Sequence, residues 1–300
     1  MRTDSKPFPI PVVAAVGPGS QVEDETLDYI TMPQGMAAYT PPSLPEPEEL
    51  GHCHGALHLL TQVLDALQQV TAAGSKASVS VSLAGLAAAD LQLVNQVLGE
   101  GEVSAQVLQP SGQAALSIQE SVFAGVWRVL ETLDDGAVRD SVEVGPVPEV
   151  LRSVARLDGA QPLSAAAPVP IQVMNAPAVL VELEDQRRTW QPGQDAHVVN
   201  LTLLPMTPDD IAYMDHRLGT GRVLILSRGY GNCRITNCCV PHTWRVVYYN
   251  SADTVILNSV EVTDMPEVVC AAPEDLADSA QRMQEVLQWL VPDNTASESA

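Results

Sequence analysis

The second half of the chain places three cysteines and one histidine within ten residues: Cys233, Cys238, Cys239 and His242. Thiolate and imidazole groups are ligands that zinc prefers, and thiolates also hold iron–sulfur clusters. In a strand, however, the adjacent Cys238 and Cys239 would point to opposite faces of the sheet and would not converge easily on one ion. We therefore predict no bound cofactor and keep a metal or iron–sulfur carrier site at these four residues as the alternative.

A glycine-rich stretch just before this cluster offers a second kind of site. Gly229 and Gly231 would let a ligand approach the backbone, and Arg228 would suit an anion, but no helix follows as a nucleotide fingerprint requires. A sharp hairpin turn explains the same residues. Trp244 is either a core residue or an interface anchor. The candidate partner-binding residues are Arg228, Gly229, Tyr230, Gly231, Asn232 and Trp244.

Catalytic arrangements find less support in the sequence. His52, Cys53 and His54 are adjacent, so they would hold one ion only with strain, and an ordinary helix start is the simpler interpretation. Cys233 could pair with His242 or His216, but no nucleophile elbow, HExxH motif or pair of carboxylates accompanies them. The sequence favours a binding protein over an enzyme and predicts no catalytic residues.

The elements that would position these residues occur twice. Shifting the chain by 120 positions places residues 203–223 on 83–103 without a gap, including Gly219 on Gly99. Further on, Trp244-Arg245 matches Trp127-Arg128, and 260–262 matches 142–144. An ordered series of such matches indicates two copies of one unit.

Each unit is predicted to be α+β, with the order strand, helix, four largely antiparallel strands, helix. The predicted helices are 56–70, 89–98, 149–156, 208–218 and 273–290. The predicted strands are 78–83, 103–108, 114–119, 126–131, 138–144, 179–183, 223–226, 246–249 and 255–262. The expected domains are a Pro-rich acidic arm 1–50, a first unit 51–157, an Ala/Pro linker 158–177, a second unit 178–290 and a disordered tail 291–300.

The charge, the apolar runs and the cysteine count of the chain argue against some classes of function. The 300 residues carry 37 acidic and 15 basic side chains, a net charge of -22, so phosphate-based binding of nucleic acid is not expected. No apolar run approaches the ~18 residues that a membrane span needs, and no convincing export signal begins the chain. The odd number of cysteines, five, then suggests a reduced, cytoplasmic setting.

Four long stretches of the sequence carry a family resemblance. They are LDYITMPQGMAAYTPPSLPEPEEL (27–50), LILSRGYGNCRI (224–235), NSADTVILNSVEVTDMPEV (250–268) and AAPEDLADSAQRMQEVL (271–287). Together they resemble the hydrogenase expression/formation proteins of the HupH/HoxQ/HyaF type, over nearly the whole chain and including a doubled C-terminal region.

The resemblance implies an accessory, chaperone-like role in maturing an uptake [NiFe]-hydrogenase. The implied client is the precursor of the iron–sulfur small subunit with its twin-arginine leader, held in the cytoplasm before export. The resemblance also implies other hydrogenase maturation factors as partners. Such a leader is basic and then apolar, which suits an acidic protein with an exposed edge strand or groove. The family supplies no catalytic residues to transfer.

Overall fold

The structure is a computed structural model that describes residues 53–74, 78–133, 135–160, 168–229 and 231–290. The predicted arm 1–50 and tail 291–300 lie outside these residues. The first half contains α1 (His54–Ala73), β1 (Val79–Ser82), α2 (Ala88–Leu98), β2 (Val103–Leu108), β3 (Ala114–Glu120), β4 (Val126–Thr132), β5 (Val138–Val144) and α3 (Glu149–Gly159). The second half contains α4 (Ala176–Thr189), β6 (His197–Asn200), η2 (Leu201–Leu203), α5 (Pro208–Leu218), β7 (Val223–Ser227), β8 (Asn232–Asn237), β9 (Thr243–Tyr249), β10 (Val255–Val262), η3 (Glu267–Val269) and α6 (Pro273–Leu290).

All the strands join one antiparallel sheet, which confirms the α+β class. The strand order is β1-β5-β4-β3-β2-β7-β8-β9-β10-β6, so each half contributes five neighbouring strands in the same relative order. The halves meet where β2 pairs with β7, and Ala105 there lies opposite Ile225, its own counterpart at 120 positions. This pairing is what a two-fold axis between two similar units produces. Superposition of the halves stays a prediction.

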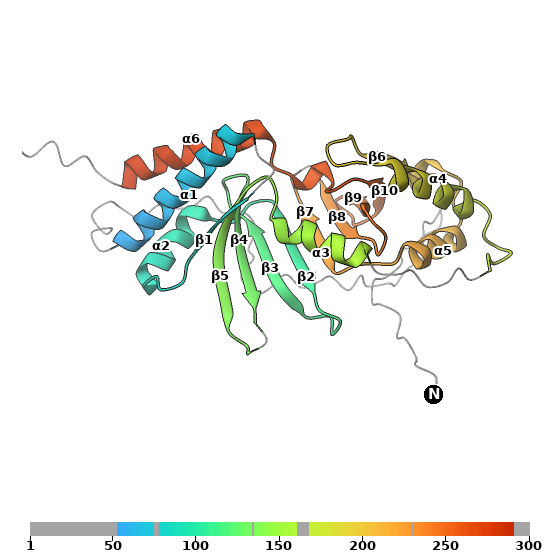
Figure 1. The fold of residues 1–300 in the computed structure, drawn as a ribbon, viewed down its shortest axis with the longest axis horizontal. Coiled ribbons are helices and arrows are strands. Elements are labelled where there is room, and N and C mark those ends of the chain that lie inside the picture. Colours follow the sequence, from blue (N-terminus) through green and yellow to red (C-terminus); the bar gives the residue numbers. More distant parts are fainter. Residues whose placement is uncertain (1–52, 75–77, 134, 161–167, 230, 291–300) are drawn as a thin grey trace, which may run out of the picture.

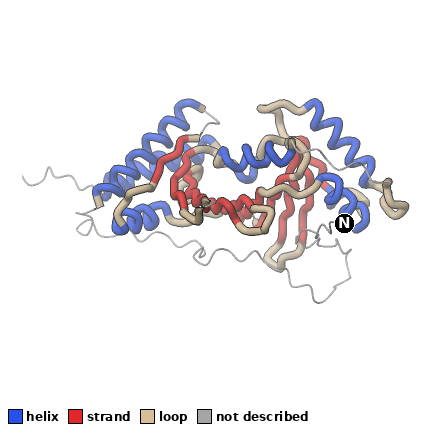
Figure 2. Tube along the Cα trace, turned by 60° about the horizontal axis from the view of Figure 1, so that its bottom comes forward, coloured by secondary structure: helices blue, strands red, loops and turns tan. Residues whose placement is uncertain are grey.

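Side chains alternate across the sheet and feed three buried clusters. On one face, α3 covers a central cluster that includes Ile118, Trp127 and Trp244. On the opposite face, α1, α2 and α6 cover one end of the sheet, and α4 and α5 cover the other end. Figure 1 shows these two helix groups at the ends with α3 between them, and Figure 2 shows the strands running continuously beneath.

The C-terminal helix returns to the first half of the molecule. α6 runs beside α1 and buries Leu276, Met283 and Leu290 in the cluster that also holds Leu60 and Val142 (Figure 1). The expected second unit therefore gives its last helix to the first half, because this helix's apolar face covers α1.

A buried carboxylate at the end of α3, which belongs to the first half, accepts hydrogen bonds from residues of the second half. Asp158 Oδ2 accepts hydrogen bonds from the Arg222 backbone N–H at 2.7 Å and from Asn237 Nδ2 at 3.0 Å. Its Oδ1 accepts from Arg222 Nε at 2.8 Å. The amide oxygen of Asn237 in turn accepts from the Val223 N–H at 2.9 Å. The end of α3 is thus hydrogen-bonded to the residue before β7 and to the last residue of β8.

Replacing Asp158 with alanine should lower the free energy of unfolding by about 2 kcal/mol, because buried donors lose their acceptor. Urea unfolding followed by circular dichroism measures this change. Glu131→Ala removes the exposed ion pair with Arg139 and is the matched control, expected to cost under about 1 kcal/mol. Equal, small effects of both substitutions would contradict the structural role of Asp158.

Most predicted elements are present, and three differences have clear physical causes. Residues 179–183 were predicted as a strand, which is wrong, because Val179 and Leu183 are buried on one side of α4 while Val181 is exposed. Part of the expected linker 158–177 belongs to helices, since α3 continues to Gly159 and α4 begins at Ala176. No element is predicted from the sequence at β6 or β8, whose apolar residues are few.

Candidate functional site

The predicted partner-binding turn connects β7 to β8. Arg228, Gly229, Gly231 and Asn232 are exposed there, and Gly231 has a φ of 103° that favours glycine. The Arg228 backbone N–H donates to the Glu102 carbonyl at 3.1 Å, which extends the β2–β7 ladder by one bond. Tyr230 lies outside the described residues. The turn is a hairpin connection with an exposed surface, and its partner contacts stay a prediction.

Carboxylates surround this turn and alter its electrostatics. A side chain at Gly229 would collide with the Glu102 carboxylate. Burial raises the pKa of Glu100, and the positive charge of Arg228 opposes that rise. Because Arg228 already interacts with an acidic neighbour, the turn is a poor receptor for an external anion.

Trp244 lies in the central cluster and not on the surface. Its side chain is 1 % exposed and that of Trp127 is 0 % exposed. Each indole Nε1–H donates to a backbone carbonyl in the segment after the following strand, Gly145 at 2.9 Å for Trp127 and Asp264 at 3.3 Å for Trp244. Trp244 therefore supports the core and presents no surface to a partner in this structure.

The four residues of the alternative metal site do not converge. Cys233 packs in the central cluster, whereas Cys238 packs on the opposite face between α4 and α5. Cys239 contacts Gly219, and the His242 ring lies 4.6 Å from the Trp190 ring. Among the described residues, no group of three or more His, Cys, Asp or Glu side chains could hold a metal ion.

The thiols are also poorly suited to nucleophilic chemistry. Burial raises the pKa of Cys233 to about 12, with the Tyr248 hydroxyl opposing, and burial likewise raises the pKa of Cys238 to about 12. Because the thiolate is the reactive form, these two cysteines are almost entirely protonated near neutral pH. Burial lowers the pKa of His242, so its imidazole favours the neutral form.

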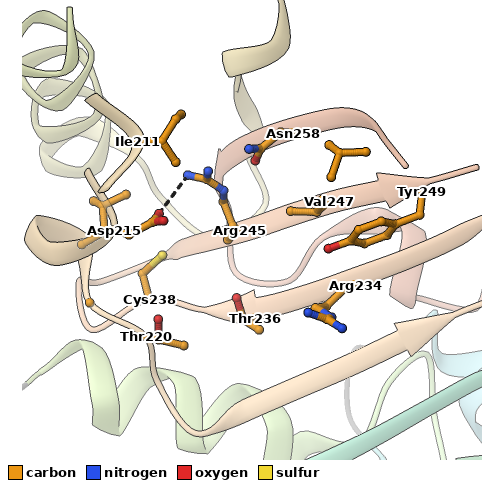
Figure 3. A pocket seen from close by; sticks show the side chains of 13 residues that line it. Ile211, Asp215, Thr220, Arg234, Thr236, Cys238, Arg245, Val247, Tyr249 and Asn258 are labelled. Atoms are coloured by element: carbon orange, nitrogen blue, oxygen red, sulfur yellow. Dashed lines mark ion pairs between the residues drawn. The ribbon is translucent and has the colours of Figure 1, made fainter. Parts of the chain in front are cut away.

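A pocket that the sequence did not reveal lies between α5 and the strands β8, β9 and β10 (Figure 3). Its volume is about 110 Å³. Its polar walls come from Asp215, Arg234, Thr236, Cys238, Arg245 and Asn258. Strand alternation aims the strand side chains of this set at one face, since Thr236 pairs with Arg245 and Val247 pairs with Asn258, and Asp215 faces them from α5.

Two arginines dominate the electrostatics of this pocket. Arg245 Nη1 lies 3.4 Å from Asp215 Oδ1, and Figure 3 shows the guanidinium between Asp215 and Asn258. Arg234 lies over the Tyr249 ring, with its guanidinium carbon 5.7 Å from the ring centroid. Burial raises the pKa of Asp215 while Arg245 opposes the rise. The pocket is therefore suited to a small polar or anionic group.

The doubled pattern of the sequence recurs in the comparison with known families. A model of the HupH hydrogenase expression protein, C-terminal conserved region, matches this chain twice, over residues 53–164 and 173–290. The chain belongs to the HupH family. Each match covers one of the two halves described above.

Full-length relatives support the same assignment. The chain is 56% identical over 283 residues to the hydrogenase expression/formation protein HoxQ of Cupriavidus necator, covering 94% of this chain and 98% of HoxQ. It is 46% identical over 282 residues to HupH of Rhodobacter capsulatus, covering 94% and 98%. It is 33% identical over 276 residues to the hydrogenase-1 operon protein HyaF of Escherichia coli, covering 92% and 95%.

A solved structure of a HupH family member is also similar to part of the chain. The hydrogenase expression protein HupH of Thiobacillus denitrificans shares 27% identity with a TM-score of 0.34, covering 38% of this chain and 93% of that one.

In the part of the chain that the structure describes, no helix has the length and apolar character that crossing a membrane requires.

Proposed function

We propose that this HupH family protein is a non-catalytic, cytoplasmic maturation factor that holds a client polypeptide of an uptake [NiFe]-hydrogenase. The client is the precursor of the iron–sulfur small subunit, recognised in part through its twin-arginine leader. Membership of a hydrogenase expression family carries this proposal. Other maturation factors can share the complex.

Charge supports a basic client segment. The chain has a net charge of -22, and opposite charges steer association and hold a basic leader near the surface. Screening limits such attraction to about 8 Å at physiological ionic strength. The leader complex should therefore weaken as salt increases.

An apolar surface at one edge of the sheet suits the apolar part of such a leader. β6 is the last strand of the sheet, and Val198 on it is 52% exposed. Leu203 in η2, which directly follows β6, is 80% exposed, and Ile256 in β10, the strand that pairs with β6, is 56% exposed. An extended peptide can add to an edge strand while its apolar side chains pack on such neighbours. We call Val198, Leu203 and Ile256 the edge surface.

The test is a titration of two clients against the full chain. A leader peptide and a leader-less small subunit are titrated by calorimetry at about 0.05 M and about 0.5 M salt. We expect the peptide to bind more weakly at high salt and to keep a salt-resistant part. Leu203→Asp should weaken peptide binding at least tenfold, because it places a charge on the edge surface.

Two further variants separate the possible surfaces. Leu157→Asp changes an exposed leucine on α3, which packs on the central cluster and not on β6, and should bind like the wild type. Arg228→Ala tests the predicted turn. Equal binding of both clients to all four proteins at both salt concentrations would show that neither the edge surface nor the leader is recognised. A pull-down from hydrogenase-producing cells, with and without the leader, checks the client in its native form.

A further inference from the structure

The pocket beside Arg245 has a counterpart in the first half, and the strand registers define it. Arg245 lies opposite Val260, two places from the Val247–Asn258 pair. Arg128 lies opposite Val142, two places from the Leu130–Asp140 pair. Asn258 therefore occupies the position of Asp140. On the helices, the backbone N–H groups of the cap glycines Gly219 and Gly99 donate to the carbonyls of Asp215 and Asn95, which makes those two residues counterparts.

The first-half site is closed by its own side chains. Arg128 Nε and Nη2 donate to the two carboxylate oxygens of Asp140, which is a bidentate pair. Arg128 Nη1 donates to Asn95 Oδ1 at 2.7 Å. Every nitrogen of the guanidinium thus has an oxygen partner, and two of these three oxygens belong to the carboxylate of Asp140.

The second-half site carries the same two residue types in exchanged positions. The carboxylate, Asp215, is on the helix, and the amide, Asn258, is on the strand. Arg245 Nη1 reaches Asp215 only at 3.4 Å, and Nη1 is buried without a hydrogen-bond partner among the described residues. The Asn258 Oδ1 atom is buried without one as well. At the strand position where Asp140 supplies its carboxylate to Arg128, the second half carries the amide of Asn258, so no carboxylate reaches Arg245 from the strand there.

The second-half site also gains a positive charge. Arg234 lies two residues before Thr236, which pairs with Arg245. In the first half, Ser117 lies two residues before Gln119, which pairs with Arg128. Ser117 is therefore the counterpart of Arg234. Among the described residues, the Arg234 guanidinium contacts the Tyr249 ring and forms no ion pair. Two arginines and one aspartate leave the pocket with a net positive charge within a strongly acidic protein.

We propose that this pocket is a receptor for one external carboxylate, which takes the position that Asp140 holds on Arg128. The carboxylate accepts from Arg245 and Arg234, and the hydroxyl of Thr236 and the amide of Asn258 lie at the same wall. At about 110 Å³ the pocket is well below the ~300–1,000 Å³ of typical small-molecule sites, so its size suits a side chain or a small acid.

The carboxylate can belong to an acidic side chain of a polypeptide or to a free small acid, and the experiment distinguishes these sources. The probes are acetate, a short blocked peptide with one glutamate, and the same peptide with glutamine. Binding to the full chain is measured by calorimetry and by the ¹⁵N chemical shifts of the Arg245 and Arg234 side chains. We expect the glutamate peptide to bind, the glutamine peptide not to bind, and acetate to bind at least tenfold more weakly than the glutamate peptide.

Two substitutions make the proposal specific to this pocket. Asn258→Asp supplies an internal carboxylate at the position of Asp140. It should weaken binding of the glutamate peptide at least tenfold. Arg234→Ser introduces the residue type that Ser117 has in the first half and should weaken binding of the glutamate peptide to a similar extent. Arg139→Ser removes an exposed positive charge from β5 and serves as the control with unchanged binding. Circular dichroism establishes that each variant is folded.

The outcomes separate clearly. Equal binding of the glutamate and glutamine peptides, or full binding to both Asn258→Asp and Arg234→Ser, overturns the carboxylate site. Stronger binding of acetate than of the peptide assigns the pocket to a free small acid and overturns the polypeptide source. None of these measurements uses a hydrogenase subunit or a leader, so their result is independent of the proposed client.

Discussion

Trp244→Ala should lower the free energy of unfolding by about 3–5 kcal/mol, the usual cost of removing a buried tryptophan from a core. The side chain is 1 % exposed and its indole N–H donates to the Asp264 carbonyl, so the substitution leaves both a cavity and an unpaired acceptor. Trp127→Ala should cost a similar amount, since that indole has the same surroundings and the same kind of hydrogen bond. Urea unfolding followed by far-ultraviolet circular dichroism measures all the variants.

Trp289 on α6 provides the matched control for this experiment. It is 41% exposed, so Trp289→Ala should cost no more than about 1 kcal/mol. A loss of client binding in Trp244→Ala with unchanged stability would show that Trp244 forms a contact surface, contrary to its position in the structure.

Asp210→Ala should cost about 3 kcal/mol or more, because one buried carboxylate accepts several charge-assisted hydrogen bonds. Its Oδ1 accepts from the backbone N–H groups of Met174, Asn175 and Ala176 at 2.8–2.9 Å, which hold the start of α4. Its Oδ2 accepts from the Thr207 N–H and hydroxyl in the capping box of α5. Removing the carboxylate should loosen the starts of both helices.

Asp90, the first-half counterpart of Asp210, is the matched control. Among the described residues it accepts one such bond, from the Ala56 N–H of α1 at 2.8 Å, so Asp90→Ala should cost about 1–2 kcal/mol. A larger loss in Asp90→Ala than in Asp210→Ala would contradict this hydrogen-bond comparison.

The pH dependence gives a second readout for Asp210. Burial favours a higher pKa, but the hydrogen bonds from Ala176 and Thr207 outweigh it and lower the pKa of Asp210. A depressed folded-state pKa contributes stability above the unfolded value of about 3.9, and this contribution is lost as the pH falls below that value. The stability of Asp210→Asn should therefore change less than that of the wild type between about pH 5 and pH 2.

The elements with local signals were predictable from the sequence. Thr207 and Pro208 with acidic residues in the first turn specify the start of α5, and Gly219 specifies its end. The helix α4 was not predictable by its pattern, because Val179, Val181 and Leu183 also fit the two-residue period of a strand. Packing against α5 and the sheet, which no local pattern encodes, selects the helix.

The pocket required the structure because its residues are distant in the sequence. Asp215, Arg234 and Asn258 come from three elements that only the sheet register brings together. One sequence signal does point to it in retrospect. Asp215 falls on Asn95 at the offset of 120, and Asn258 falls on Asp140 at the offset of 118 that also places 260–262 on 142–144, so an asparagine and an aspartate exchange positions around the arginine. The chemical meaning of that exchange appears only when both sites are seen on the same face of the sheet.

The return of α6 to α1 has a consequence for protein synthesis. Leu276, Met283 and Leu290 complete the cluster around α1, yet they follow all ten strands along the chain and leave the ribosome after them. Until then the nascent first half exposes the apolar face of α1, while domains commonly begin to fold from the N-terminus during translation. A chain that stops before residue 273 therefore leaves the cluster around α1 uncovered, so quality control by proteases should remove such truncated products more readily than chains that contain α6.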